Sequence, residues 1–370
     1  MKILHTALMK SFTPGIVNQM YDELTSAQEL KIDLDVKIFS PNQEVPDKFE
    51  ELFEFCNIST NKSKIGSWFE YRKSYYDWLR SKENDIDYYI LRYTTYDFLQ
   101  YLFIKNAKKP VYLVHHTKEL DELCSLGFKG KILSILDRFF GNRAINASSG
   151  IIGVTGEIVE YEKLRIKNLN KKNFIYPNGI KFRKFDFKDR RVNDVPECLF
   201  VASYFYDWHG LDLLIKAVKE SNQNIIIHIV GKVSDIDYRN MLIDERFKYH
   251  GALTHEQILI IAEQCWLGLG SFALYRKNMQ QACTLKVREY LSMGLPTYSG
   301  YEDIFPKGFK FYKFDSVDID KIVNYAKEIR KYSKDDIIKE ALPYISKEQL
   351  LLKLLCEIAN NSNESLERVI

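Results

Sequence analysis

The sequence predicts an α/β protein made of two doubly wound domains, each built on a parallel sheet. Short apolar, β-branched runs alternate with amphipathic stretches along the chain, which is the rhythm of parallel βα units. A length of 370 residues accommodates two domains of ordinary size, each with its own core. The rhythm stops at a polar stretch over residues 181–194, after Pro177-Asn178-Gly179, and then restarts. We therefore expect one domain over residues 1–178 and a second over residues 179–346.

In the first half, apolar runs predict strands and amphipathic segments predict the helices between them. The opening run, MKILHTAL, is short and lacks a small-residue cleavage site, so it is typical of a first strand and not of a signal peptide. The predicted strands are 2–8, 35–39, 87–93, 111–115, 150–155 and 173–176. The predicted helices include 17–30, 68–81, 96–106 and 157–167.

The second half repeats this alternation. Thr254 and Gln257 form the sequence pattern of a capping box, which predicts the start of a helix. The predicted strands are 197–202, 224–231, 248–251, 266–270 and 296–299, and the predicted helices are 211–219, 256–264, 285–293 and 319–332. Residues 347–360 have the periodicity of a further amphipathic helix.

Composition excludes several classes of protein. A hydrophobic content of 46% and a charged content of 28% are typical of a soluble globular chain, and a net charge of +3 gives no argument for nucleic acid. No apolar run approaches the length of a transmembrane helix, so any membrane contact would be peripheral. Basic clusters at 105–109 and 163–172 indicate either solvated helix ends or contact with an anionic membrane surface or lipid-diphosphate acceptor. Six scattered cysteines without C-x-x-C spacing indicate reduced thiols in a cytoplasmic protein and no structural zinc.

The segment over residues 267–300 carries the clearest functional signal. It predicts a short strand, a basic loop, and a helix that begins at Thr284 and ends at Gly294. The first N–H groups of a helix lack partners, and the helix dipole favours negative charge there. Glu289, one turn into the helix, is placed to accept hydrogen bonds from ribose hydroxyls, so the segment predicts a nucleotide-sugar site. The candidates for binding its diphosphate are Arg276, Lys277 and Lys286, with the backbone N–H groups of Thr284 and Leu285.

This segment resembles the donor-binding signature of retaining glycosyltransferase family 4, which has the GT-B fold. That signature has two glutamates with seven residues between them, and the second is followed by a hydrophobic pair, a small residue, Gly, any residue and Pro. Residues 289–296, EYLSMGLP, match its second half, and the L-K-x-x-E-Y form resembles a branch of bacterial surface-polysaccharide transferases. Residues 176–180, YPNGI, resemble the turn that opens the family's second domain, and residues 200–218 resemble its strand–loop–helix. In this fold, a C-terminal helix at about 347–370 would return to pack on the first domain.

Two positions depart from the family pattern. Gln281 stands where the resemblance implies a glutamate that touches the donor sugar; an amide still donates and accepts hydrogen bonds. Ser203 and His209 stand near the positions of the family's Arg and Lys. A histidine beside a helix start can donate to phosphate, and Gly210 allows close backbone approach, although His209 could equally pack under Trp208. Lys232, at the end of a predicted strand, is a further phosphate candidate.

The first domain offers candidates at the carboxyl ends of its predicted strands. Gly15, in Thr13-Pro14-Gly15, lies between the first strand and the first helix, where the family often has glycines near the donor phosphate or acceptor. This turn is not G-x-G-x-x-G, which argues against a nicotinamide dinucleotide. His115 and His116 end a strand at the same edge and are candidates to bind or orient an acceptor, with a structural role equally open.

The resemblance implies a retaining glycosyltransferase that moves a sugar from a nucleotide-diphosphate sugar, UDP-sugar in preference to GDP-sugar, to a lipid-linked or protein-linked surface glycan. It implies no cofactor and no metal, since cations and helix dipoles would stabilise the leaving diphosphate. Two alternatives stay open. One is a catalytically silent GT-B subunit that binds glycan or a partner transferase, which Gln281, Ser203 and His209 motivate. The other is a nucleotide-sugar epimerase-like protein of the same fold.

Overall fold

The computed structural model of the chain describes residues 1–59, 62–182 and 188–360. The chain divides into two compact units, which we describe separately. Unit 1 comprises Met1–Pro177 and the described residues from Lys347 onward, and unit 2 comprises Asn178–Ser346. Among the described residues, no helix is both long enough and apolar enough to cross a membrane.

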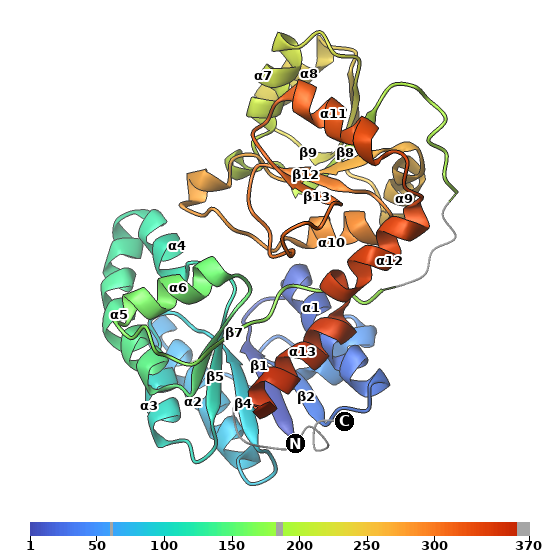
Figure 1. Cartoon of the computed structure of the whole chain (residues 1–370). Helices are drawn as coiled ribbons and strands as arrows, with labels where there is room; N and C mark the ends of the chain where they lie inside the picture. The colour runs from blue at the N-terminus through green and yellow to red at the C-terminus, as the bar shows by residue number, and fades with distance from the viewer. Residues whose placement is uncertain (60–61, 183–187, 361–370) are drawn as a thin grey trace. The chain divides into compact units, whose positions relative to one another are not determined.

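The described residues of unit 1 form seven strands and the helices that connect them (Figure 1). The strands are β1 (Ile3–Leu8), β2 (Leu34–Ser40), β3 (Phe53–Phe55), β4 (Tyr88–Arg92), β5 (Val111–His115), β6 (Gly150–Gly153) and β7 (Asn173–Ile175). The helices are α1 (Pro14–Glu29), η1 (Asp47–Leu52), α2 (Lys64–Lys82), α3 (Phe98–Asn106), α4 (Glu119–Ser125), α5 (Gly127–Ala147), α6 (Gly156–Arg165) and α13 (Lys347–Asn360).

The unit 1 sheet has the order β3-β2-β1-β4-β5-β6-β7, and every pairing is parallel. Successive residues of each strand face opposite sides, so the apolar runs fill two cores. One core joins the sheet to α1 and α13, which lie side by side in Figure 1. The other joins it to α2, α3 and α5. The result is a three-layer α/β/α unit.

The described residues of unit 2 form six strands. They are β8 (Glu197–Tyr204), β9 (Ile226–Lys232), β10 (Phe247–Gly251), β11 (Leu267–Leu269), β12 (Thr297–Ser299) and β13 (Tyr312–Phe314). The helices are η2 (Asp207–His209), α7 (Leu211–Glu220), α8 (Asp235–Leu242), α9 (His255–Gln264), η3 (Leu274–Lys277), α10 (Leu285–Ser292), α11 (Ile319–Ile329) and α12 (Lys334–Ile345).

The unit 2 sheet has the order β10-β9-β8-β11-β12-β13, again with only parallel pairs. The core on one face packs α7 and α11 on the sheet, and the core on the other packs α9 and α10. The predicted α/β class, with two doubly wound parallel-sheet units, is therefore confirmed. The capping box is also present, since Thr254 N–H donates to the Gln257 side chain at 2.9 Å and Gln257 N–H donates to Thr254 Oγ1 at 3.4 Å.

The chain passes between the units twice, and the two passages run side by side in unit 2. Ile180 N–H donates to the carbonyl of Ile345 at 2.9 Å, and Ile180 forms a parallel bridge with Ser346. Asn178 joins the start of this unit to the loop before α10, because its side-chain amide donates to the carbonyl of Cys283 at 2.7 Å. The Pro-Asn-Gly turn is therefore hydrogen-bonded to the segment that carried the functional signal.

Candidate functional site

The strand order of unit 2 reverses between β8 and β11. Numbered within the unit, the order is 3-2-1-4-5-6, which is that of a dinucleotide-binding sheet, and ligands of such sheets bind outside the carboxyl ends of the strands at the reversal. The loop after β8 leads to η2, and the loop after β11 leads to η3 and α10. Most of the residues that the sequence singled out lie in these two loops.

The loop after β8 holds His209 as a neutral hydrogen-bond donor. Its Nδ1 accepts from the backbone N–H of Tyr206 at 3.0 Å, so the proton of the neutral ring resides on Nε2. Burial and the nearby charges of Lys286 and Lys277 lower the pKa of His209 to about 3. Its ring stacks on Trp208 with centroids 3.7 Å apart. His209 can therefore pack against Trp208 and still have an N–H group to donate to a phosphate, which are the two roles that the sequence left open.

Gly210 lets the two loops meet. Its φ of 71° lies in the left-handed region, and a Cβ there would come within 2.9 Å of Phe272 Cβ and 3.1 Å of the Ala273 nitrogen. The backbone N–H of Phe272 donates to the carbonyl of His209 at 2.8 Å. A glycine is needed because the loop after β11 occupies the space of a side chain.

Lys286 supplies a buried cation in the first turn of α10. Its Nζ is enclosed and has no hydrogen-bond partner within the part of the chain that the structure describes, although its stem is partly exposed. The amine lies 5.2 Å from the centroid of the Phe200 ring in β8. Burial lowers its pKa to about 7, a shift that the charge of Glu289 opposes. An enclosed amine without a partner is costly for the free protein and favours an anionic ligand.

The start of α10 is open for the same ligand. Thr284 occupies the N-cap, but its side chain makes no capping hydrogen bond, and the first turn contains no acidic residue. Its hydroxyl instead pairs with the hydroxyl of Tyr301 at 2.7 Å. Leu285 is the first residue of the helix. The N–H groups of the first turn therefore have no side-chain acceptor from the cap.

Lys277 lies in the same neighbourhood, because its Nζ is 5.3 Å from the centroid of the Trp208 ring. We call Trp208, His209, Lys277 and Lys286 the switch-point cluster. Glu289 is an exposed residue of α10, one turn beyond Lys286. Lys232 ends β9 with its side chain exposed, and its carbonyl accepts from Phe205 N–H at 2.8 Å. The switch-point cluster joins two segments that are distant in the sequence, the loop after β8 and the loop and helix after β11.

Arg276 and Gln281 have protein partners in this structure. The Arg276 guanidinium forms a two-pronged ion pair with Asp212 of α7, at 2.8 and 3.0 Å, and donates to the carbonyl of Asp207 at 2.7 Å. The Gln281 side chain donates from Nε2 to the Glu302 carboxylate at 3.0 Å, and the backbones of these two residues form a parallel β-bridge. Each side chain would have to exchange these partners before it could contact a donor.

In unit 1, the expectation that His115 contacts an acceptor does not fit the structure. His115 is completely buried, stacks on Tyr93 with centroids 4.5 Å apart, and pairs through Nδ1 with Glu119 at 3.2 Å. His115, Glu119 and Glu162 hold ligand atoms within 4.8 Å of one another, a spacing that a metal ion could use. Arg165 pairs with Glu162 at 3.2 Å, so a protein cation already compensates charge there. A positioning role in a buried ion network explains His115 better.

His116 is only partly buried and stays a candidate for the acceptor side. Burial lowers its pKa well below the usual range, and the charges of Arg92 and His5 act in the same direction. The ring is therefore neutral. Gly15 is exposed at the start of α1, and a Cβ there would meet nothing within 4 Å. The space above it is open to a ligand.

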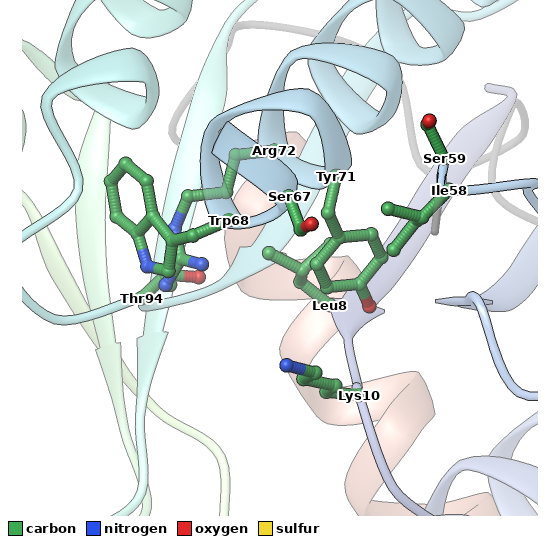
Figure 2. Close-up of a pocket in the computed structure, with 9 residues that line it drawn as sticks. All are labelled: Leu8, Lys10, Ile58, Ser59, Ser67, Trp68, Tyr71, Arg72 and Thr94. Atoms are coloured by element: carbon green, nitrogen blue, oxygen red, sulfur yellow. The ribbon is translucent and has the colours of Figure 1, made fainter. Parts of the chain in front are cut away.

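A pocket of about 360 Å³ lies at the strand-order reversal of unit 1, between β1 and β4 (Figure 2). Figure 2 shows Trp68 and Arg72 of α2 beside Thr94, with Lys10 near Tyr71. The Arg72 guanidinium lies 4.1 Å from the centroid of the Trp68 ring. The lining is completed by Leu8, Ile58, Ser59 and Ser67.

None of these lining residues was among the sequence candidates. Trp68 and Arg72 are four residues apart on one helix, so they share a face, and that spacing was the available signal. Lys10 follows β1 and Thr94 follows β4, and they become neighbours only because these two strands pair. The pocket combines an aromatic wall, two cations and hydroxyl groups, which suits a sugar that carries a negative charge.

No family model matches the sequence, and no curated protein sequence matches it. Solved structures do match. The chain is similar to the lipopolysaccharide outer core galactosyltransferase WaaB, at 13% identity over 97% of this chain and 100% of that one, with a TM-score of 0.65. It is similar to Anabaena HepE in complex with UDP, at 12% identity over 97% and 100%, with a TM-score of 0.68.

A protein of another activity is also similar. The putative UDP-N-acetylglucosamine 2-epimerase from Listeria monocytogenes matches at 11% identity over 100% of this chain and 99% of that one, with a TM-score of 0.56. Identities this low are informative about architecture alone. Together with the strand orders above, these likenesses show that the chain has the GT-B fold, with two Rossmann-like units.

Proposed function

We propose that the protein is a glycosyltransferase that transfers a sugar from a nucleotide-diphosphate sugar to a glycan acceptor. The observation that carries the proposal is the enclosed Nζ of Lys286 at the switch point of unit 2, which has no hydrogen-bond partner among the residues that the structure describes. A buried amine destabilises a free protein unless a ligand compensates it, and a diphosphate supplies the matching charge. The uncapped start of α10 and the donor Nε2–H of His209 support the same ligand.

We propose UDP-sugar as the favoured donor, because HepE is described in complexes with UDP and with UDP-glucose. Glu289 would accept hydrogen bonds from the ribose, and Lys286, His209 and the α10 N–H groups would stabilise the departing diphosphate. We assign the chain to retaining family 4 and to a reaction without metal, on the sequence signature at residues 289–296. In such a reaction the leaving phosphate would help to take the proton from the acceptor hydroxyl.

For the acceptor side we propose the unit 1 pocket. Trp68 contributes an aromatic wall for the apolar side of a pyranose, although Arg72 covers one face of its ring, and Lys10 and Arg72 supply positive charge. This combination favours an anionic acceptor such as a lipid-diphosphate-linked sugar of a growing surface glycan. Arg72 already pairs with the buried carboxylate of Asp97 at 3.0 Å, so Lys10 is the cation with more freedom to meet an acceptor.

Donor binding tests the proposal first. We expect UDP to bind the wild-type protein in calorimetry without added metal, and GDP and ADP to bind more weakly. Glu289→Ala should weaken UDP binding by about 10- to 100-fold, since it removes hydrogen bonds to a charged acceptor. Glu220→Ala, at an exposed pair with Lys216 on α7, is the matched control and should leave the affinity unchanged. Failure of every nucleotide diphosphate to bind folded protein would overturn the proposal.

The acceptor pocket gives a separate prediction. Trp68→Ala should lower kcat/KM for a sugar linked to a short-chain prenyl diphosphate by about 10-fold or more, because the stacking surface is lost. UDP affinity and slow hydrolysis of the donor should be unchanged, since the donor groups lie in unit 2. Phe69→Ala removes an adjacent exposed ring that does not line the pocket and serves as the control. Equal losses in the two variants would contradict the assignment.

A second candidate function is nucleotide binding without transfer, in a silent subunit. The pairs Arg276–Asp212 and Gln281–Glu302 favour it, because each occupies a side chain that transfer would require. UDP binding with neither transfer to any acceptor nor hydrolysis of UDP-sugars would select this alternative. An epimerase-like activity would instead show as interconversion of two UDP-sugars.

A further inference from the structure

Helix α5 of unit 1 presents its apolar side to the surface. Phe128 is 82% exposed, Ile135 is 66% exposed, and Phe139 is 52% exposed. At 3.6 residues per turn, these and their neighbours span about 100° of the helix circumference. The α5 apolar face consists of Phe128, Ile132, Ile135, Leu136 and Phe139, and the exposed Leu126 immediately precedes the helix.

The opposite side of α5, which packs inward, is polar and small. Gly130 is buried where a Cβ would lie 2.0 Å from the carbonyl oxygen of Leu123, so α4 and α5 approach closely. Gly141 is buried where a Cβ would lie 2.0 Å from the hydroxyl of Tyr93. Asp137 is fully buried and pairs with Arg165 at 2.5 Å. Most of the buried residues of α5 are thus small or polar, and apolar core residues, Ala144 and Ile145, occur only near its end.

The exposed charged residues of α5 itself have one sign. The only acidic residue of α5 is the buried Asp137, whereas its four basic residues are exposed. On the helix circumference Lys129 flanks one side of the apolar face and Lys131 and Arg138 flank the other, whereas Arg143 lies within its arc, one turn beyond Phe139. The guanidinium of Arg143 lies 3.6 Å from the centroid of the Phe139 ring, which holds one charge at the level of the apolar side chains. The basic residues are Lys129, Lys131, Arg138 and Arg143.

We propose that the α5 apolar face docks unit 1 onto an anionic phospholipid surface, with the helix lying in the plane of the interface. Apolar side chains would enter the acyl boundary, and the flanking cations would extend to the lipid phosphates. Charge decides between this occupant and a second copy of the chain. A two-fold contact through α5 would bring four cations against four cations without an exposed acidic residue of the helix to offset them.

Flotation with lipid vesicles tests the proposal on the full chain. The wild-type protein should float with vesicles of phosphatidylcholine containing about a third phosphatidylglycerol, and not with phosphatidylcholine alone. Binding should fall as salt is raised from about 0.05 to 0.5 M. Two variants should each lower the partition coefficient at least about tenfold. One is the double variant Phe128→Ser/Ile135→Ser, and the other is the triple variant Lys129→Gln/Lys131→Gln/Arg138→Gln.

Two control variants separate this surface from general stickiness. Ile236→Ser/Leu242→Ser removes similarly exposed apolar side chains of α8 in unit 2, and Lys216→Gln/Lys219→Gln removes exposed charge of α7. Both should keep the wild-type partition coefficient within about twofold. All variants change exposed residues, and unchanged UDP affinity would show that the donor site is intact.

The outcomes are distinct from those of the donor test. No flotation of folded wild-type protein with anionic vesicles would overturn the proposal, as would equal losses in test and control variants. Size-exclusion chromatography with light scattering tests whether the α5 apolar face binds a second copy of the chain. A wild-type dimer that Phe128→Ser/Ile135→Ser converts to a monomer would assign the α5 apolar face to self-association instead.

Discussion

Lys286→Met should strongly weaken nucleotide binding and at the same time stabilise the protein without ligand. The amine is enclosed, lies near the Phe200 ring, and has no hydrogen-bond partner in the described residues. If a diphosphate is its natural partner, removing the charge should weaken UDP binding on the order of 100-fold or more. Methionine has a similar length and no charge to desolvate, so the free energy of unfolding should rise by roughly 1–3 kcal/mol.

The pH dependence of stability gives an independent check on the same residue. Burial places the pKa of Lys286 at about 7 in the folded state, below its usual value of 10.5. Below about pH 7 the amine is protonated in both states, and the folded state bears the full cost of the buried charge. Between pH 7 and 10.5 the unfolded chain binds more protons than the folded one, so this residue makes stability rise with pH. Lys286→Met should remove that rise.

UDP binding should reverse the lowering of the Lys286 pKa. A bound diphosphate raises the pKa of Lys286, so UDP binding takes up a proton near and above pH 7, and the affinity should fall as pH increases. Calorimetry in two buffers of different ionisation enthalpy measures this uptake, which Lys286→Met should abolish. Lys313→Met, at an exposed lysine of the same unit that is not a site candidate, is the control and should change neither stability nor proton uptake. A destabilised Lys286→Met protein that still binds UDP would contradict the argument.

Sequence reasoning succeeded where one local pattern decides the outcome. Buried parallel strands are continuous apolar runs, so β1, β5 and β8 were predicted at or within two residues of their observed ends. The edge strands β3 and β13 were not predicted, because three residues give too short a pattern and their placement depends on a neighbouring strand. Boundaries for α5 were not predicted either. Its apolar face is exposed, so the rule that apolar residues point inward gives the wrong side.

The candidate site shows the same division. The loop sequence identified Lys286 and Glu289, but the enclosure of the Lys286 amine depends on β8, more than eighty residues earlier. Arg276 was expected to meet phosphate, and its pairing with Asp212 could not be foreseen across 64 residues. His115 looked accessible at a strand end, and only the surrounding α4 and α6 carboxylates reveal a buried network. Local sequence gives the chemistry of a side chain, whereas its exposure and partners come from the fold.

The largest effect on stability should come from breaking the ion pair that anchors α10. Arg288 and Asp303 are both completely buried, with two hydrogen bonds of 2.5 and 2.6 Å between guanidinium and carboxylate. Arg288→Met leaves an uncompensated carboxylate and Asp303→Asn leaves an uncompensated guanidinium. Each should lower the free energy of unfolding of unit 2 by about 3–5 kcal/mol. Since α10 carries Lys286 and Glu289, UDP affinity should fall as well.

The double variant Arg288→Met/Asp303→Asn should recover much of that loss, because no buried charge remains. The asparagine Oδ1 can still accept from the backbone N–H of Ile304, which the aspartate does at 2.7 Å. Urea unfolding of the four proteins gives the coupling energy, which should be on the order of 2–3 kcal/mol. Removing Lys216 from its exposed pair with Glu220 should cost less than about 0.5 kcal/mol. If the single variants lose as little stability as that control, packing alone holds α10. If the losses of the single variants simply add in the double variant, the charges of Arg288 and Asp303 do not stabilise each other.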